Sequence, residues 1–464
     1  MSILAFSYIP RHFQGNSLNF DSNKSHKINR MNIMLTNQTT NLKDLLAKDE
    51  QYLSSALYKV FHIVSEKGEG PYLITTDGEK YLDLTCGIGV TQLGHCHPEV
   101  VKAAQEQLEK LIHVSCVTHH TRNIQLAETL AEILPGDINS TFFCNSGAEA
   151  VDGSIKLSRY VNPGRPNIVA FRGSFHGRTL GATSLSSSKA LHRKNYDPLL
   201  AGINFVDFPN CWHCPVFKDP KSCEGECLDL LTRMFKLNLP PESISAIIIE
   251  PIVGEGGYVP SPPHNINSRF NYLKELRKIC DEYNILLICD EVQSGIARTG
   301  KWFSIEHYDV VPDVITMAKG IANGLPMGAF STKKKFMSLM PPASHGSTFG
   351  GNLVSCAAAQ KTLEVIKRDH LLDYVSKTGT EVMKHLENEL KSKAKIRGFG
   401  FMIGIELLSK EIADKVVEEC FKEKMLILTS GAEQKVIRFI PPLNMEKTLL
   451  LNTIDRIITI IKKS

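Results

Sequence analysis

The sequence predicts an α/β protein with a large domain on a mostly parallel sheet and a smaller α+β domain. The chain has 464 residues, which at about 150 residues per domain indicates two or three domains. Hydrophobic residues make up 42% and charged residues 22%, a balance typical of a globular protein with a buried core. Short apolar runs alternate with segments of helical periodicity, the pattern of β–α units. Collagen, coiled-coil and small disulfide-stapled folds are excluded by the same composition.

Five short apolar runs predict strands of the large sheet. Each is almost continuously apolar and bounded by turn residues, as in a parallel sheet covered by helices on both faces. The runs lie at 141–144, 167–171, 246–250, 285–291 and 314–318. The segment 269–283 has the length of a helix that crosses over between parallel strands. We place the large domain at residues 99–345, with its first helices over 99–111 and 123–134.

The rest of the chain predicts the smaller domain. Helical patterns and short strands alternate after residue 345, at 353–367, 380–391, 401–407, 411–424 and 436–440. Residues 346–464 are therefore expected to form an α+β unit, which the N-terminal segment 45–98 completes.

Residues 1–44 are predicted to form an N-terminal extension. Residues 1–43 carry five Lys and Arg residues against the single acid Asp21, and they are rich in Asn and Ser. A basic leader with few acids is compatible with a mitochondrial transit peptide, whereas a secretory signal would need an apolar core. An unstructured tail, or a true start at Met31 or Met34, explains the composition equally well. The sequence thus predicts a mitochondrial location, with the cytoplasm as the alternative.

The charge balance argues against nucleic acid and membrane partners. Lys and Arg number 53 and Asp and Glu number 49, so the net charge is only +4, and no basic block stands out. No uninterrupted apolar stretch approaches the roughly 20 residues that a membrane-spanning helix requires. Small molecules are therefore the expected ligands.

A glycine-containing turn follows the first predicted strand. Ligands of open α/β sheets bind beyond the carboxyl ends of the strands, so this turn is a candidate site. In NSGAEA (145–150), Ser146 and Gly147 open a helix whose free N–H groups suit an anion. Taken alone, the same turn is an ordinary helix cap.

A second glycine-rich turn, RGSFHGRT (172–179), follows the next strand. Phe175 and His176 offer flat rings for a planar ligand, and Arg178 offers a cation for a carboxylate or phosphate. The alternative is a glycine-rich loop whose arginine is simply solvated.

Charged residues end the following strands. Glu250 and Glu255 lie at and beyond the end of one run, Asp290 ends the next, and Lys319 directly follows the last. A buried acid needs a cationic partner, and a desolvated lysine has a lowered pKa that makes it a nucleophilic amine. Each residue also has an ordinary explanation, such as an N-cap, an ion pair or a surface lysine with a buried stem.

Together these features meet the requirements of pyridoxal phosphate (PLP). The anion cradle would hold the phosphate, an aromatic face would cover the cofactor ring, and Asp290 would keep the pyridine nitrogen protonated. Lys319 would bind the aldehyde as a Schiff base. The sequence therefore predicts a PLP-dependent enzyme.

The same motifs resemble those of the class-III PLP-dependent aminotransferases, the 4-aminobutyrate, ornithine and acetylornithine group. The resemblance covers roughly residues 50 to 445 and is densest over 286–329, which matches the family signature at nearly every position. HGSTFGGN (345–352) and GHCHP (94–98) match as well. Leu353 departs from the family, in which Pro usually follows GGN. The resemblance implies a fold type I PLP enzyme.

The resemblance also implies roles around the cofactor ring. Lys319 would be both the Schiff-base lysine and the catalytic base, and Asp290 would pair with the pyridine nitrogen. The ring would lie between Phe175 and Val292, while Gln293 would hydrogen-bond the phenolic oxygen.

The phosphate-binding residues follow from the same resemblance. Ser146, Gly147 and Ala148 would bind the phosphate, and Thr348 would reach the phosphate of the neighbouring subunit. This sharing requires a homodimer. Glu250 would support the site from nearby.

Four positions match substrate-binding residues of the family. Arg178 corresponds to the arginine that binds a distal carboxylate, and Glu255 and Arg438 correspond to a switching pair. A transaminase accepts first a donor without a carboxylate beside the reacting carbon and then 2-oxoglutarate, which has one, so an arginine held and then released serves both. Ile88 matches a pocket position of the aminobutyrate enzymes, near which ornithine enzymes tend to have an aromatic residue.

The sequence thus predicts transamination of an ω-amino acid, most simply 4-aminobutyrate, with 2-oxoglutarate as acceptor. An acetylornithine- or ornithine-type aminotransferase is the first alternative, because these enzymes share most of the same residues. A racemase or lyase on the same scaffold is the second, since fold and cofactor do not settle the reaction. The Glu255–Arg438 pair favours a transaminase with two substrates, and Lys319 and Asp290 argue against a non-catalytic protein.

Four of the 12 cysteines crowd into one loop. The segment CWHCPVFKDPKSCEGEC (211–227) places CxxC ahead of CxxxC. A tetrahedral thiolate site for zinc, or an iron–sulfur site, would use Cys211, Cys214, Cys223 and Cys227. A reduced loop or a pair of local disulfides is an equal alternative. The other eight, such as Cys144 and Cys289, are expected to be apolar fillers of a reducing interior.

Overall fold

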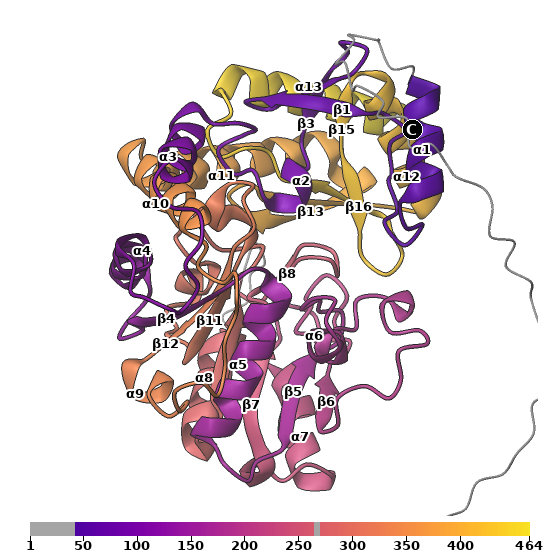
Figure 1. The fold of residues 1–464 in the computed structure, drawn as a ribbon. Helices are drawn as coiled ribbons and strands as arrows, with labels where there is room; N and C mark the ends of the chain where they lie inside the picture. Colours follow the sequence, from indigo (N-terminus) through magenta and orange to yellow (C-terminus); the bar gives the residue numbers. More distant parts are fainter. Residues whose placement is uncertain (1–41, 264–269) are drawn as a thin grey trace, which may run out of the picture.

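The computed structural model describes residues 42–263 and 270–464. Residues 1–41 of the predicted extension, with the proposed leader, lie outside the described residues. Figure 1 shows two stacked bodies, with β5, β6 and β7 in the lower one and the C-terminal helices α12 and α13 in the upper one.

A seven-stranded sheet forms the lower body, in the order β4-β12-β11-β10-β7-β5-β6. Only β12 is antiparallel to its neighbours, so the sheet is mostly parallel, as predicted. The strands span Ser140–Cys144 (β4), Asn167–Phe171 (β5), Ile203–Val206 (β6), Ile244–Ile249 (β7), Leu286–Asp290 (β10), Val314–Met317 (β11) and Gly328–Thr332 (β12). β6 and β12 are not among the predicted strands, because polar residues or a glycine interrupt their apolar runs.

Helices pack on this sheet and contribute to the burial of its central strands. Every residue of β7 and β10 is buried, α5 packs on β11 and β12, and α8 packs on β10. The helices of this body span Gly147–Val161 (α5), Leu180–Leu185 (α6), Asp229–Leu237 (α7), Tyr272–Tyr283 (α8) and Lys334–Met337 (α9). The Asn271 side chain accepts from Lys274 N at 3.1 Å and so begins α8.

The upper body contains an antiparallel sheet in the order β13-β14-β17-β16. Its strands span Ala394–Phe399 (β13), Met402–Leu407 (β14), Leu428–Ser430 (β16) and Val436–Phe439 (β17). The accompanying helices span Leu353–Arg368 (α10), Leu371–Leu390 (α11), Lys410–Lys422 (α12) and Lys447–Lys463 (α13). The helix expected at 380–391 is the second half of α11. The helix contains Gly379 at a close contact with another segment. A Cβ at this position would come within 2.3 Å of the Gly400 carbonyl oxygen, so only glycine fits.

The N-terminal segment shares a sheet with the C-terminal part of the chain. The order is β1-β2-β3-β15, and Leu82 of β3 lies opposite Met425 of β15 in parallel register. The elements here span Leu42–Tyr52 (α1), Ser65–Glu69 (β1), Tyr72–Thr75 (β2), Lys80–Asp83 (β3), Cys86–Gly89 (α2), Pro98–Leu108 (α3), Thr121–Ile133 (α4) and Met425–Leu426 (β15). Because α3 and α4 both pack on α10, the domain boundary near residue 99 stays a prediction.

Short elements complete the fold. The hairpin strands span Ile252–Val253 (β8) and Val259–Pro260 (β9). The 3-10 turns span Ala190–His192 (η1), Glu226–Leu228 (η2), Pro241–Ser243 (η3), Ser304–Tyr308 (η4), Lys319–Ala322 (η5) and Lys391–Lys393 (η6).

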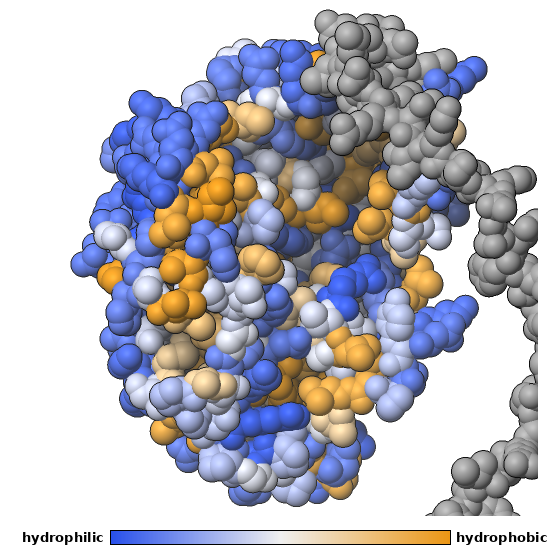
Figure 2. Space-filling model, viewed as in Figure 1, coloured by the Kyte–Doolittle hydropathy of each residue, from blue (hydrophilic) through white to orange (hydrophobic). Residues whose placement is uncertain are grey.

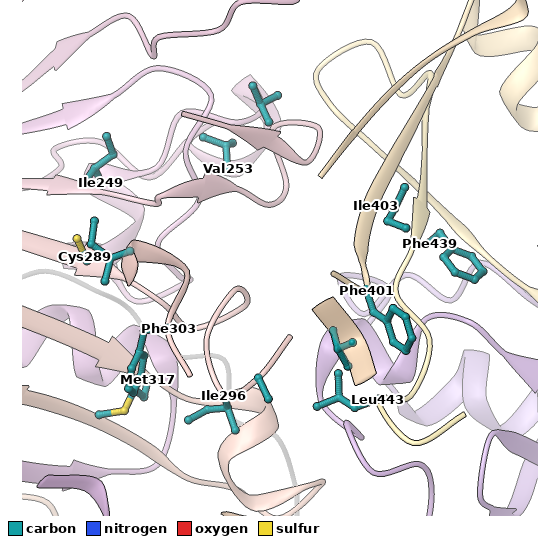
Figure 3. Close-up of a cluster of buried hydrophobic side chains, with 14 of the residues drawn as sticks. Ile249, Val253, Cys289, Ile296, Phe303, Met317, Phe401, Ile403, Phe439 and Leu443 are labelled. Carbon is teal, nitrogen blue, oxygen red and sulfur yellow. The ribbon is translucent and has the colours of Figure 1, made fainter. Parts of the chain in front are cut away.

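One hydrophobic core extends through both bodies. Figure 3 shows side chains of the large sheet, among them Cys289 and Met317, on one side and Phe401 and Phe439 on the other, and all belong to one buried cluster. Cys289 is fully buried among these apolar residues, as expected of a filler. The same prediction is wrong for Cys96 and Cys116, which are exposed.

Candidate active site

The ends of the parallel strands open into a cavity of about 630 Å³. This volume suits a small-molecule ligand. Twelve of the predicted site residues line it: Ser146, Gly147, Ala148, Phe175, His176, Arg178, Glu250, Glu255, Asp290, Val292, Gln293 and Lys319. Of the predicted residues, all of which the structure describes, Ile88, Thr348 and Arg438 are not in the lining. The structure therefore brings together residues from five separate stretches of the sequence.

Asp290 is held in a fixed orientation at the end of β10. His176 Nδ1 lies 2.7 Å from Asp290 Oδ2, and Val292 N donates to Oδ1 at 3.0 Å. Because a carboxylate only accepts, the histidine proton resides on Nδ1. His176 was predicted to offer a flat ring to a planar ligand. In the structure it instead contacts Asp290 and orients its carboxylate.

Lys319 begins the turn η5 directly after β11. Its φ of 48° is in the left-handed region, a strained conformation for a lysine that is typical of functional sites. Burial lowers the pKa of Lys319, and Arg438 acts in the same direction against the opposing effect of Glu255. A lowered pKa increases the fraction of neutral, nucleophilic amine near neutral pH.

The N-terminus of α5 forms the predicted anion cradle. Ser146 caps the helix, since its Oγ accepts from Glu149 N at 3.2 Å. A Cβ at position 147 would come within 2.9 Å of Val292 Cγ1, so only glycine lets this turn lie against the cavity wall. At Gly177, which has a φ of 139°, a Cβ would come within 2.6 Å of Ala148 Cβ.

Glu250 supports the cavity wall through two backbone contacts. Its Oε1 accepts from Phe175 N and its Oε2 from Gly254 N, both at 2.7 Å. Burial raises the pKa of Glu250 to about 7, and the nearby Asp290 adds to this effect. The carboxyl group therefore fixes the backbone that presents Phe175.

Glu255 and Arg438 form an ion pair at the cavity. Arg438 Nη1 lies 2.5 Å from Glu255 Oε1, and both side chains are largely buried. Although burial opposes its ionisation, Arg438 and Lys319 hold the pKa of Glu255 below its usual value. Glu255 lines the cavity, whereas its partner Arg438 is buried and is not in the lining.

The cavity contains polar groups that are suited to a polar ligand. The buried atoms His176 Nε2 and Gln293 Oε1 have no hydrogen-bond partner among the described residues. Such atoms are costly to bury unless something binds them. With the cradle, Asp290 and Lys319 in the same lining, the donor set fits the phosphate, ring and aldehyde of PLP.

Part of the cavity wall consists of residues that were not predicted from the sequence. Leu325, Pro326 and Met327 line the cavity, and their GLPMG segment lies inside the densest stretch of the family resemblance, which was the available signal. Lys189 is close enough to interact electrostatically with Glu255 and Arg438, and burial lowers its pKa.

Ile88 and Thr348 are both exposed. Ile88 is 48% exposed and lies in a kink of α2 with a φ of 67°. Thr348 is exposed beside Phe349, which is 62% exposed. The departure at Leu353 leaves the neighbouring helix intact, because Asn352 Oδ1 accepts from Val354 N at 3.0 Å and caps α10.

The predicted metal-binding cysteines are free thiols in the structure. Cys211, Cys214, Cys223 and Cys227 line one small pocket. Within the described ranges, no three His, Cys, Asp or Glu side chains stand in a ready-made metal-binding arrangement. Nor is any helix in those ranges long and apolar enough to cross a membrane.

Comparisons with known proteins agree with this geometry. The family model for class-III aminotransferases matches residues 53–461. An acetylornithine aminotransferase of Archaeoglobus fulgidus is 36% identical over 381 residues, which cover 82% of this chain and 91% of the relative. An alanine/serine racemase of Pyrococcus horikoshii is 35% identical over 437 residues, 90% of each chain.

A solved structure gives the same result for the fold. The ornithine aminotransferase of Toxoplasma gondii, described with partial occupancy of PLP at its active site, superposes with a TM-score of 0.81 at 28% identity. The match covers 92% of this chain and 95% of that one. The model is thus consistent with fold type I, and PLP is the cofactor expected of such a protein. The chain belongs to the class-III PLP-dependent aminotransferase family.

Proposed function

We propose that the protein transfers the terminal amino group of an N-acetylornithine-type donor to 2-oxoglutarate. The Glu255–Arg438 pair at the cavity carries this proposal, because it suits a donor whose reacting carbon has no carboxylate. Several further relatives bear the name acetylornithine aminotransferase, at 37–38% identity. The 4-aminobutyrate prediction is not indicated by these relatives, and the alternative to it is favoured.

PLP, when bound, would accept the amino group and the electrons of the substrate C–H bond. The α5 N-terminus would hold its phosphate, and Asp290, oriented by His176, would hold the ring nitrogen. Phe175 and Val292 would cover the ring, and Gln293 would bind the phenolic oxygen. Lys319 Nζ would move the proton that leaves the substrate carbon, for which a lowered pKa is suited.

The Glu255–Arg438 pair would let one site accept two kinds of substrate. With the donor bound, Glu255 would neutralise Arg438, so this arginine would not attract a carboxylate to the reacting carbon. When 2-oxoglutarate binds, Glu255 would swing away and Arg438 would bind the carboxylate next to the keto group. Both partners are needed, because an unpaired buried charge is costly.

We expect Glu255→Gln to separate the two half-reactions. The variant leaves Arg438 charged without its partner, so reaction with the carboxylate-free end of the donor should slow by roughly 10–100-fold. Reaction with glutamate and 2-oxoglutarate should be largely retained. Stopped-flow measurement of each half-reaction tests this, with Glu433→Gln, an exposed partner of Lys435, as control. Equal loss in both half-reactions would contradict a switch.

We expect Arg178→Ala to weaken recognition of the distal carboxylate. Arg178 lines the cavity, is exposed, and has its guanidinium 5.3 Å from the Phe175 ring centroid, a position suited to a carboxylate that enters from solvent. Loss of one charged hydrogen-bonding contact should raise KM for N-acetylornithine roughly 10- to 150-fold. The control is Arg172→Ala, since Arg172 is exposed and pairs with Asp207. An unchanged KM would move carboxylate recognition elsewhere.

A panel of amino donors tests the proposed function directly. N-acetylornithine, ornithine, 4-aminobutyrate and L-alanine are each offered with 2-oxoglutarate, and glutamate formation is measured. We expect the highest kcat/KM with N-acetylornithine. The similarity to an alanine/serine racemase favours a second candidate activity. Loss of optical activity from L-alanine or L-serine without an acceptor would identify it and overturn the transaminase proposal.

We propose that the protein acts as a homodimer. Phe349, next to Thr348, is exposed, and the two residues share a small pocket with His113, Val114, Ser115 and Asn123. The segment around these pocket residues contains further exposed apolar side chains, at Leu108, Leu111, Ile112, Val117 and Ile124. Figure 2 shows apolar surface on the face that contains α3 and α4. Large exposed apolar patches typically mark interfaces. Because Thr348 is exposed and is not in its own cavity lining, a phosphate contact would be with a partner's cofactor. Sedimentation of the holoenzyme tests the dimer.

The mitochondrial prediction receives no support from the comparisons. The four acetylornithine aminotransferases and the racemase, at 35–38% identity, are from archaea and a bacterium. The residues on which the prediction depends lie outside the described ranges.

A further inference from the structure

The four cysteines of the loop 211–227 converge although 16 residues separate the first from the last. All four line one small pocket, in which Cys227 is buried and the other three cysteines are half-buried. The loop therefore gathers four thiols from two turns into one partly buried place.

Two of the sulfurs already accept backbone hydrogen bonds. Gly225 N donates to Cys223 Sγ at 3.3 Å, and Lys218 N donates to Cys214 Sγ at 3.4 Å. Each donor lies a short turn after its cysteine, and the turns contain left-handed residues, Phe217 and Gly225. An N–H aimed at sulfur stabilises a thiolate far more than a thiol.

The space between the thiols is small. The pocket lined by the four cysteines has a volume of about 10 Å³ and is closed by Pro209, Pro215, Pro220 and Phe270. This is about the volume of one water-sized sphere. A single ion held between the four sulfurs suits so small a space.

The same loop docks on the upper body beside the active site. His213 Nε2 lies 2.6 Å from Glu406 Oε1, and the Arg397 guanidinium lies 5.7 Å from the Trp212 ring. Arg397 pairs with Glu406 and donates from Nε to Gly257 O at 2.9 Å. Burial opposes ionisation of Glu406, but Arg397 and His213 lower its pKa to about 2, so the pair is charged.

This network extends to the segment that contains Glu255, the partner of Arg438. Gly257 is two residues from Glu255, whose carbonyl oxygen accepts from Gly431 N at 2.9 Å. The cysteine loop is thus connected through Arg397 to the segment that presents Glu255 to the cavity.

We propose that Cys211, Cys214, Cys223 and Cys227 bind one structural zinc ion, which fixes the loop that supports the Gly254–Gly257 segment. In the structure the thiol of Cys223 donates to Glu226 Oε2 at 3.2 Å. Binding requires rotation of the thiol side chains toward the pocket and the loss of one proton from each. A tetrahedral set of four thiolates is the usual structural zinc site. The two positive charges of the ion offset the burial that otherwise keeps these thiols protonated.

Metal analysis of the purified holoenzyme tests the proposal without any mutation. The protein is purified in the presence of a thiol reductant and without added metal, and zinc and iron are measured by mass spectrometry. We expect one zinc per chain. Titration with a mercurial reagent, monitored with a zinc-sensitive dye, should release that zinc as four thiols react.

A matched pair of variants locates the metal. Cys211→Ser/Cys214→Ser should lose the zinc and melt at a lower temperature, while it keeps its bound PLP absorbance. The control is Cys96→Ser/Cys116→Ser, which removes two exposed cysteines outside the loop and should keep the zinc. Retention of PLP separates this result from a failure of the proposed function.

Three results would overturn the proposal. Wild-type protein with no more zinc than the loop variant would exclude the site. Detection of bound iron together with acid-labile sulfide would show that the loop binds an iron–sulfur cluster and not zinc. Zinc-free protein in which the four loop thiols react only after reduction would show that local disulfides hold the loop.

Discussion

Lys319→Ala is expected to reduce transamination at least about 10²- to 10⁴-fold, the contribution of a positioned proton-transfer group. Lys319 lies in the cavity at the end of β11. Burial lowers its pKa, which favours the neutral amine that can accept a proton. The same change removes the nitrogen to which PLP would be attached. The cofactor should therefore be lost on dialysis and should not be fixed by borohydride. Rates in single turnovers and the visible absorbance of the treated protein measure both effects.

A second lysine provides the control. Lys334 is exposed and begins α9, at the opposite end of β12 from the cavity. Lys334→Ala should leave both the rate and the borohydride-stable cofactor unchanged. If Lys319→Ala kept the visible band after borohydride treatment and dialysis, the attachment would belong to another residue.

Asp290→Asn is expected to lower kcat by about 10²- to 10⁴-fold. The carboxylate of Asp290 would pair with the protonated ring nitrogen in a buried site, and breaking a buried charge pair costs about 3–5 kcal/mol. His176 Nδ1, now 2.7 Å from Asp290 Oδ2, would face an amide, which orients it less strongly. Asp290→Glu retains the charge and should recover part of the rate. Kinetics at saturating PLP distinguish slower chemistry from weaker cofactor binding.

A buried aspartate outside the cavity separates catalysis from stability. Asp313 pairs with Arg277 at 2.6 Å and accepts from Leu287 N at 2.9 Å. Asp313→Asn should lower the melting temperature and leave kcat nearly unchanged. If Asp290→Asn behaved in the same way, Asp290 would have only a structural role.

Several features of the fold could be predicted because they depend on local pattern. The buried strands β5, β7, β10 and β11 are apolar at nearly every position, and that pattern appears in the sequence whatever surrounds it. The antiparallel strand β12 could not be found in this way. Its first residue, Gly328, lies against the Ser146 backbone, where a Cβ would come within 2.3 Å of the carbonyl oxygen. The need for glycine therefore depends on a tertiary contact that the strand's own sequence does not show.

The sequence by itself determined the residue types and their order: a helix-capping serine, a strand-end aspartate and a strand-end lysine, in motifs that resemble one family. These properties are local, because caps, turns and strand ends are specified within a few residues. Only the tertiary structure decided the pairings. His176 lies 114 residues before Asp290 and Glu255 lies 183 before Arg438, so their contacts depend on how the strands are ordered. The convergence of the four loop thiols depends in the same way on packing, since spacing specifies which sulfurs are near in the chain but not the pocket that they enclose.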